Sequence, residues 1–212
     1  MVQGDEDWLE LAMMVAQDDS AACARYNLGA RPEQAVWLHL GPVPFVGALT
    51  TAPVVMLLSH ADCDESAGTE DYAFVRPGWP LSALHPQATV GVRDRWASRA
   101  ADLITVFGAQ HVSNSIAALF LTPWRTRRFD KRLRLPSRSL MLSLARSVAA
   151  RDAILVLSPD AEQWLESDPV AALPATRLLR PSGRDTTELT PASLGVGAWE
   201  QVCRQIDVHA WL

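Results

Sequence analysis

The sequence has little cysteine, and this scarcity excludes two kinds of small-domain framework. Its three cysteines, Cys23, Cys63 and Cys203, are odd in number and far apart, and no two form a CxxC pair. This spacing fits neither a zinc ribbon nor a set of disulfides. The sequence therefore predicts a protein of the reducing cytoplasm, and we expect no cofactor.

Signals for export and for membrane insertion are also lacking. The first ten residues, MVQGDEDWLE, are acidic and do not have the basic start of a signal peptide. No apolar run approaches the ~20 residues that a bilayer-spanning helix needs. We expect no membrane partner.

Lysine is almost absent, because Lys131 is the only one. Arginine carries the remaining basic charge, and its planar, permanently charged fork suits phosphate contacts. The alternative is that the many arginines simply reflect a compositional bias of the sequence. The formal net charge of -5 argues against binding a polyanion through bulk charge.

Hydrophobic residues make up 49% of the 212-residue chain, enough for a sizeable core. Apolar runs that suit strands alternate with segments that suit helices, which predicts an α/β fold. We expect a three-layer α/β/α sandwich with a mostly parallel, four-stranded central sheet, formed by residues 41–212 behind an N-terminal helical extension of residues 1–40. The predicted strands cover residues 54–58, 116–121, 153–157 and 175–179, and the predicted helices cover residues 5–18, 93–107, 137–150 and 197–208.

Ligands of such sheets bind beyond the carboxyl ends of the strands, so the strand exits are the places to look for a site. The first exit holds His60, Asp62, Cys63, Asp64 and Glu65. A water-activating or base-contacting role for His60 or Asp62 is one interpretation, and the solvated start of a loop is the other. A metal site fits less well because the spacing is loose, and the surrounding acids disfavour a Cys63 thiolate.

The second exit is strongly basic. Residues 123–151 carry nine cations and one acid, Asp130, so the rest of the chain is strongly acidic. Trp124 and Phe129 lie within this stretch, and aromatic rings beside arginines can stack on unpaired bases. The pattern indicates a nucleic-acid surface, with a solvated loop paired to the acids of residues 61–71 as the alternative.

The last exit reads RPSGRD, from Arg180 to Asp185. Its small residues and Ser182 could hold a phosphate through backbone amides, although an ordinary Pro/Gly loop explains the spacing as well.

The order of these features resembles the uracil-DNA glycosylase superfamily, especially divergent bacterial members. The stretch PVPFVGALTTAPVVMLL resembles the family's Pro-rich approach and first strand, and SHADCD stands at its Asn-Pro-Gly-like exit. Further along, PWRT, LPSR, AILVL with Trp164, RPS and TPASLGVGAWEQV match later motifs in order and spacing. The likeness covers roughly residues 42–206, and Arg180 stands where the family has a histidine.

The resemblance implies base flipping followed by N-glycosidic cleavage. His60 or Asp62 would orient water, and Arg180 would offset negative charge on the departing base. The partner would be nucleic acid, expected to be DNA. The residues expected to bind it are Trp124, Arg125, Arg127, Arg128, Arg138 and Ser182.

Two other functions fit the sequence. The same fold could bind nucleic acid without cleaving it, because few residues match the family at the reactive positions. The acidic N-terminal region could instead bind a protein partner, with some of the eight tryptophans at the interface.

Overall fold

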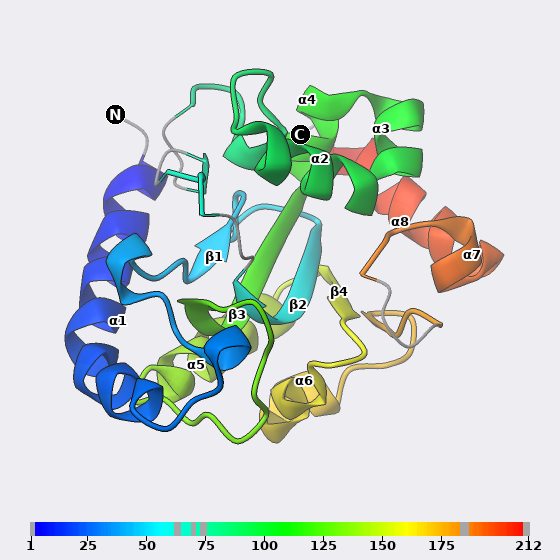
Figure 1. Cartoon of the computed structure of the whole chain (residues 1–212). Helices are drawn as coiled ribbons and strands as arrows, with labels where there is room; N and C mark the ends of the chain where they lie inside the picture. The colour runs from blue at the N-terminus through cyan, green and yellow to red at the C-terminus, as the bar shows by residue number, and fades with distance from the viewer. Residues whose placement is uncertain (1–2, 62–64, 69–70, 73–75, 183–186, 210–212) are drawn as a thin grey trace.

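The computed structural model describes residues 3–61, 65–68, 71–72, 76–182 and 187–209 (Figure 1). The chain is a mixed α/β protein built on one sheet. The strands are β1 (Phe45–Val46), β2 (Val54–Ala61), β3 (Ile116–Arg125), β4 (Ile154–Leu157) and β5 (Leu178–Leu179). The α-helices are α1 (Gln3–Asn27), α2 (Val90–Arg99), α3 (Ala101–Phe107), α4 (Ala109–Ser115), α5 (Arg138–Ala149), α6 (Asp168–Ala171), α7 (Pro191–Leu194) and α8 (Val196–His209), and the 3-10 helices are η1 (Pro32–Gln34), η2 (Leu38–Leu40), η4 (Ser82–Leu84) and η5 (Glu162–Glu166).

The sheet has five strands in the order β1-β3-β2-β4-β5, one more than the sequence predicted. The additional strand, β1, pairs antiparallel with β3, and the other pairings are parallel. Strand β2 comes first among the parallel strands, with the next one, β3, on one side and the later β4 and β5 on the other. The strand order therefore reverses between β2 and β4, and open α/β sheets bind ligands beyond such a point.

Both faces of the sheet are covered, because successive side chains of a strand point to opposite sides. On one face Val54 and Met56 belong to an apolar cluster with residues of α2, α3, α4 and α8. On the other, Val55 and Leu57 belong to a cluster with residues of α1, α5, η5 and α6. Figure 1 shows helices on either side of the strands.

Helix α1 is longer than predicted and is joined to the sheet by a buried carboxylate. Asp19 is 0% exposed and accepts hydrogen bonds from Trp124 Nε1 at 2.9 Å, from Ser137 Oγ at 2.6 Å and from the Ser137 N–H at 2.9 Å. These bonds connect α1 to the end of β3 and to the start of α5. Among the described residues, no helix has the length and apolar character needed to cross a membrane.

Candidate functional site

Strand β2 changes its pairing with β3 at the first exit. His60 pairs with Thr122, whereas Ala61 pairs with Arg125, so the register shifts between His60 and Ala61. Pro123 lies in the skipped part of β3 and has no N–H to donate to a ladder. Irregularities of this kind re-aim side chains and are frequent beside active sites.

A chain of hydrogen bonds connects β2 to the exit of β4, at the point where the strand order reverses. The Ser59 hydroxyl donates to Asp160 Oδ2 and lies 2.9 Å from His60 Nδ1. The other oxygen, Asp160 Oδ1, accepts from Ser158 Oγ at 2.5 Å. Ser59 and Ser158 are 3% and 4% exposed, while His60 and Asp160 are half-buried, so the chain reaches from the interior toward the surface.

This arrangement sets the tautomer of a neutral His60. An ionised carboxylate only accepts hydrogen bonds, so the single hydroxyl proton of Ser59 is used on Asp160. The contact with His60 then requires the Nδ1–H to donate, which makes Nε2 the acceptor nitrogen of the neutral ring. A Ser-His-Asp triad has the imidazole between the other two, whereas here the serine is between, so this is not the arrangement of a serine nucleophile.

Two aromatic side chains support the cluster. The Phe129 ring stacks on His60 with centroids 5.6 Å apart and an interplanar angle of 7°. Trp164, fully buried in η5, donates its indole N–H to the Leu58 carbonyl at 3.0 Å. Both contacts restrict how the end of β2 can move, and Phe129 covers one face of the imidazole.

Two of the residues predicted to bind nucleic acid are interior residues. Trp124 is 2% exposed and is held by Asp19, so it is not available for stacking on a base. Arg125 is also 2% exposed; it donates to the Ala67 carbonyl at 3.0 Å, and its guanidinium lies 4.5 Å from the Tyr72 ring centroid. The predicted strand ended at residue 121, but β3 continues to Arg125 and is buried along its whole length. The start of the basic motif is therefore the interior end of a strand and not an exposed loop.

The other predicted arginines differ in their accessibility. Arg127 is 62% exposed, pairs with Glu65 at 2.7 Å and lies 5.6 Å from the Trp37 ring centroid. Arg138 is only 13% exposed and pairs with Glu166 at 2.7 Å, which leaves it poorly placed for a phosphate. Arg128 is exposed. The alternative of loop arginines paired to acids of residues 61–71 therefore holds for Arg127.

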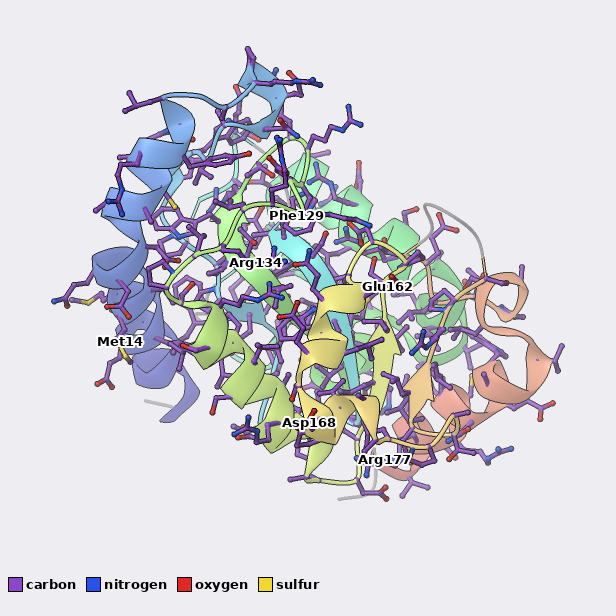
Figure 2. All side chains as sticks on the ribbon, turned by 90° about the horizontal axis from the view of Figure 1, so that it is seen from below. Met14, Phe129, Arg134, Glu162, Asp168 and Arg177 are labelled. Atoms are coloured by element: carbon purple, nitrogen blue, oxygen red, sulfur yellow. The ribbon has the colours of Figure 1, made fainter. Side chains whose placement is uncertain are left out.

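The rest of the connection between β3 and α5 remains basic at its surface. Lys131, Arg132 and Arg134 are exposed, and Arg132 forms a two-pronged contact with Asp130 at 3.1 and 3.0 Å. Hydrogen bonds from Arg132 lower the pKa of Asp130 to about 2. Burial and the hydrogen bond to Asp130 raise the pKa of Tyr26 to about 12, so α1 also holds this connection. In Figure 2, viewed from below, Phe129 and Arg134 of this connection lie close to one another in projection.

The residues predicted from the last motif lie elsewhere. Arg180 follows the edge strand β5, two strands from β2, or about 10 Å sideways at the usual strand spacing. It lines a separate hollow with residues of α6, β5 and α8. Both the N–H and the hydroxyl of Ser182 donate to the Ser193 carbonyl, at 2.6 and 3.0 Å, so neither is available to a phosphate. Arg180 and Ser182 follow β5 and not a neighbour of β2, so the structure places them at a different strand exit from His60.

Asp62, Cys63 and Asp64 lie outside the described residues, so the role predicted for Asp62 stays a prediction. In the part of the chain that is described, no group of three or more His, Cys, Asp or Glu side chains is arranged to hold a metal ion.

Comparison with known proteins adds no relative. The chain matches no family model, no curated protein and no solved structure. The resemblance to uracil-DNA glycosylases therefore stays a prediction.

The sequence did not single out Asp160 or Ser158. A signal was present, because both residues follow the predicted strand of residues 153–157. What the sequence could not reveal is that β4 lies directly beside β2, which brings this carboxylate to the Ser59 hydroxyl.

Proposed function

We propose that this protein is a divergent DNA glycosylase-like protein that binds nucleic acid at the carboxyl end of its sheet and excises a modified or damaged base. The observation that carries the proposal is the Asp160–Ser59–His60 hydrogen-bond chain at the reversal of strand order, beside a basic connection. The two covered faces of the sheet support the three-layer α/β/α arrangement that the same likeness implies.

Binding would use the exposed cations of the β3–α5 connection. Arg128, Lys131 and Arg134 are exposed and form no ion pair among the described residues, so they can pair with phosphates. Trp37 and Phe129 offer rings at the same place, and a base that leaves its stack is commonly held against such rings.

Cleavage would use His60 as a general base. Its Nε2 takes a proton from the water whose oxygen bonds to the anomeric carbon of the sugar. The bond from that carbon to the base nitrogen breaks at the same time, its electron pair leaves with the base, and the departing base takes a proton from solvent. The resulting imidazolium keeps its Nδ1–H on Ser59, and the negative charge of Asp160 stabilises it through that hydroxyl. Asp160 is thus a positioning residue, and His60 is the group that contacts water.

The test is an assay for abasic sites on single-stranded and duplex oligonucleotides that carry uracil, hypoxanthine, alkylated or oxidised bases. The wild type should release at least one of these bases. His60→Ala should reduce the rate by about 10²–10⁴-fold, the usual contribution of a positioned general base. His85→Ala serves as the matched control, because His85 follows η4 and its described side-chain contacts are with Trp79 and Gln87. This variant should keep full activity.

Absence of product across the panel from folded wild-type protein would contradict the catalytic part, as would full activity of His60→Ala. Nucleic-acid binding without product would instead support the second candidate, a binding module that does not cleave. Burial of Trp124 and Arg125 favours this second candidate, because two residues expected to bind nucleic acid are not at the surface.

Exposed apolar side chains on α1 favour a third candidate function, in which the N-terminal region binds a protein partner. Leu9, Met13 and Met14 of α1 are 54%, 65% and 43% exposed, which is unusual for large apolar side chains. Figure 2 shows Met14 on the outer side of the helix. Co-purification of a stable partner that Met13→Glu abolishes would support this role.

A further inference from the structure

The edge of the sheet farthest from β1 carries a hollow of about 420 Å³ that the proposed function does not use. Its lining is apolar apart from one cation. The residues that matter are Ala171, Leu173, Leu178, Leu194, Ala198 and Arg180. The volume is in the range of ligand sites in proteins, and a single charged group in an apolar lining is typical of a site that orients its ligand.

Strand β5 borders this hollow, and some of its backbone groups have no described hydrogen-bond partner. Leu155 pairs with Leu178 and donates to the Arg177 carbonyl at 2.7 Å, so Leu179 is the residue whose N–H and carbonyl face β4. The N–H and carbonyl of Leu178 and of Arg180 then point away from the sheet. The Leu178 N–H is bonded to the Pro174 carbonyl, but within the described residues neither the Leu178 carbonyl nor the Arg180 N–H has a partner.

Arg180 is the last residue of this edge whose backbone N–H could bond to an added strand. Pro181 has no N–H, and the Ser182 N–H is already bonded to the Ser193 carbonyl. The Arg180 side chain is exposed and forms no ion pair with any described acid. A strand added beside β5 could therefore form two backbone hydrogen bonds with it. Its side chains would contact apolar residues of α6 and α8, and its end would lie at the Arg180 guanidinium.

We propose that this groove binds an extended apolar peptide segment that ends in a free carboxylate. The segment adds to β5 in the parallel sense, donating an N–H to the Leu178 carbonyl and accepting from the Arg180 N–H. Its terminal carboxylate accepts two hydrogen bonds from the Arg180 guanidinium, because a bidentate pair with a carboxylate is a strong contact for arginine. Its apolar side chains fill the space between α6 and α8. The site is independent of the His60 cluster, so either assignment can fail without the other.

The probe is N-acetyl-Val-Leu-Val with a free carboxylate, titrated to millimolar concentration into ¹⁵N-labelled full-length protein and followed by amide shifts. We expect saturable shifts at Leu178, Leu179, Arg180 and Ala198. The same peptide with an amidated C-terminus should bind at least 10-fold more weakly. The Arg180→Ala variant should bind the free-carboxylate peptide at least 10-fold more weakly than the wild type does, and Arg180→Lys should restore part of this affinity.

Arg204→Ala is the matched control, because Arg204 is an exposed arginine of α8 whose only described partner is Glu200, and it should bind as the wild type does. A variant with an N-methyl group on the probe amide that meets the Leu178 carbonyl should also bind at least 10-fold more weakly. Equal affinity of the free and amidated peptides would overturn the proposal. So would the absence of shifts at these amides, or hexanoate binding as tightly as the peptide.

Discussion

Asp19 shows how one buried carboxylate can connect three elements. It is fully buried and forms no ion pair with a described cation. Its carboxylate accepts three hydrogen bonds from Trp124 and Ser137. Ser137 occupies the N-cap position of α5, but its hydroxyl donates to Asp19 and makes no capping hydrogen bond. A buried carboxylate is tolerated only where donors replace its hydration, so the three bonds are the reason that Asp19 can be interior.

Replacing Asp19 by alanine should therefore destabilise the protein strongly. The indole N–H of Trp124 and the N–H and hydroxyl of Ser137 would lose their acceptor inside the protein, at a cost of roughly 3 kcal/mol. Urea denaturation followed by tryptophan fluorescence measures this loss as a lower midpoint. Asp18→Ala, which removes an exposed acid from the next position, should change the free energy of unfolding by less than about 0.5 kcal/mol. Equal midpoints for the two variants would show that the Asp19 contacts contribute little.

The same residue affects a neighbouring thiol. Burial, and secondarily the charge of Asp19, raise the pKa of Cys23 to about 12. At neutral pH the thiol stays protonated, and a protonated thiol is a poor nucleophile and a poor metal ligand. Cys23 is thus an interior apolar group.

At the scale of elements, the β3–α5 connection is the part that decides nucleic-acid binding. The sequence pointed to Arg125, Arg127 and Arg128 together, but Arg125 is buried and Arg127 is paired with Glu65. Within this connection, the exposed cations that form no ion pair with a described acid are Arg128, Lys131 and Arg134.

Changing these three residues to alanine should weaken binding to single-stranded DNA and reduce its salt dependence. Each lost phosphate contact removes about 0.7 from the slope of log K against log salt for single strands. The slope should therefore fall by up to about 2, measured by fluorescence anisotropy between 50 and 200 mM salt. The matched control is the triple change of Arg25, Arg146 and Arg204 to alanine, which removes the same charge from exposed sites on α1, α5 and α8. Equal slopes for the two triple variants would show that binding follows bulk charge only.

The three longer strands could be predicted because each is an unbroken apolar run at the centre of a covered sheet. Val54–Ala61, Ile116–Arg125 and Ile154–Leu157 contain or closely match the predicted ranges. Strand β1 was missed because it has only two residues beside a proline, and its existence depends on pairing with Leu119 and Ala118. The polar exit of β2 was also visible, whereas its connection to Asp160 depends on which strands are neighbours.

At the scale of the whole molecule, the contacts of α1 bear on the expected boundary at residue 40. Trp8, Val15 and Cys23 are 3%, 0% and 0% exposed and belong to the two apolar clusters on opposite faces of the sheet. Tyr26 adds a hydrogen bond to Asp130, and Asp19 adds its three. An element that fills both clusters and satisfies buried donors contributes to the stability of the whole sheet.

We therefore expect residues 41–212 not to fold as an independent unit. Without residues 1–40, Trp124 and Ser137 lose Asp19, and apolar side chains from both clusters become exposed to water. The full chain should unfold in one transition, with far-ultraviolet circular dichroism and tryptophan fluorescence giving the same midpoint. The shortened chain should lack a cooperative transition, and adding a peptide of residues 1–40 in excess should restore it, because α1 supplies the missing contacts. A shortened chain that unfolds cooperatively at the midpoint of the full protein would instead establish the first 40 residues as an appendage to an independent domain.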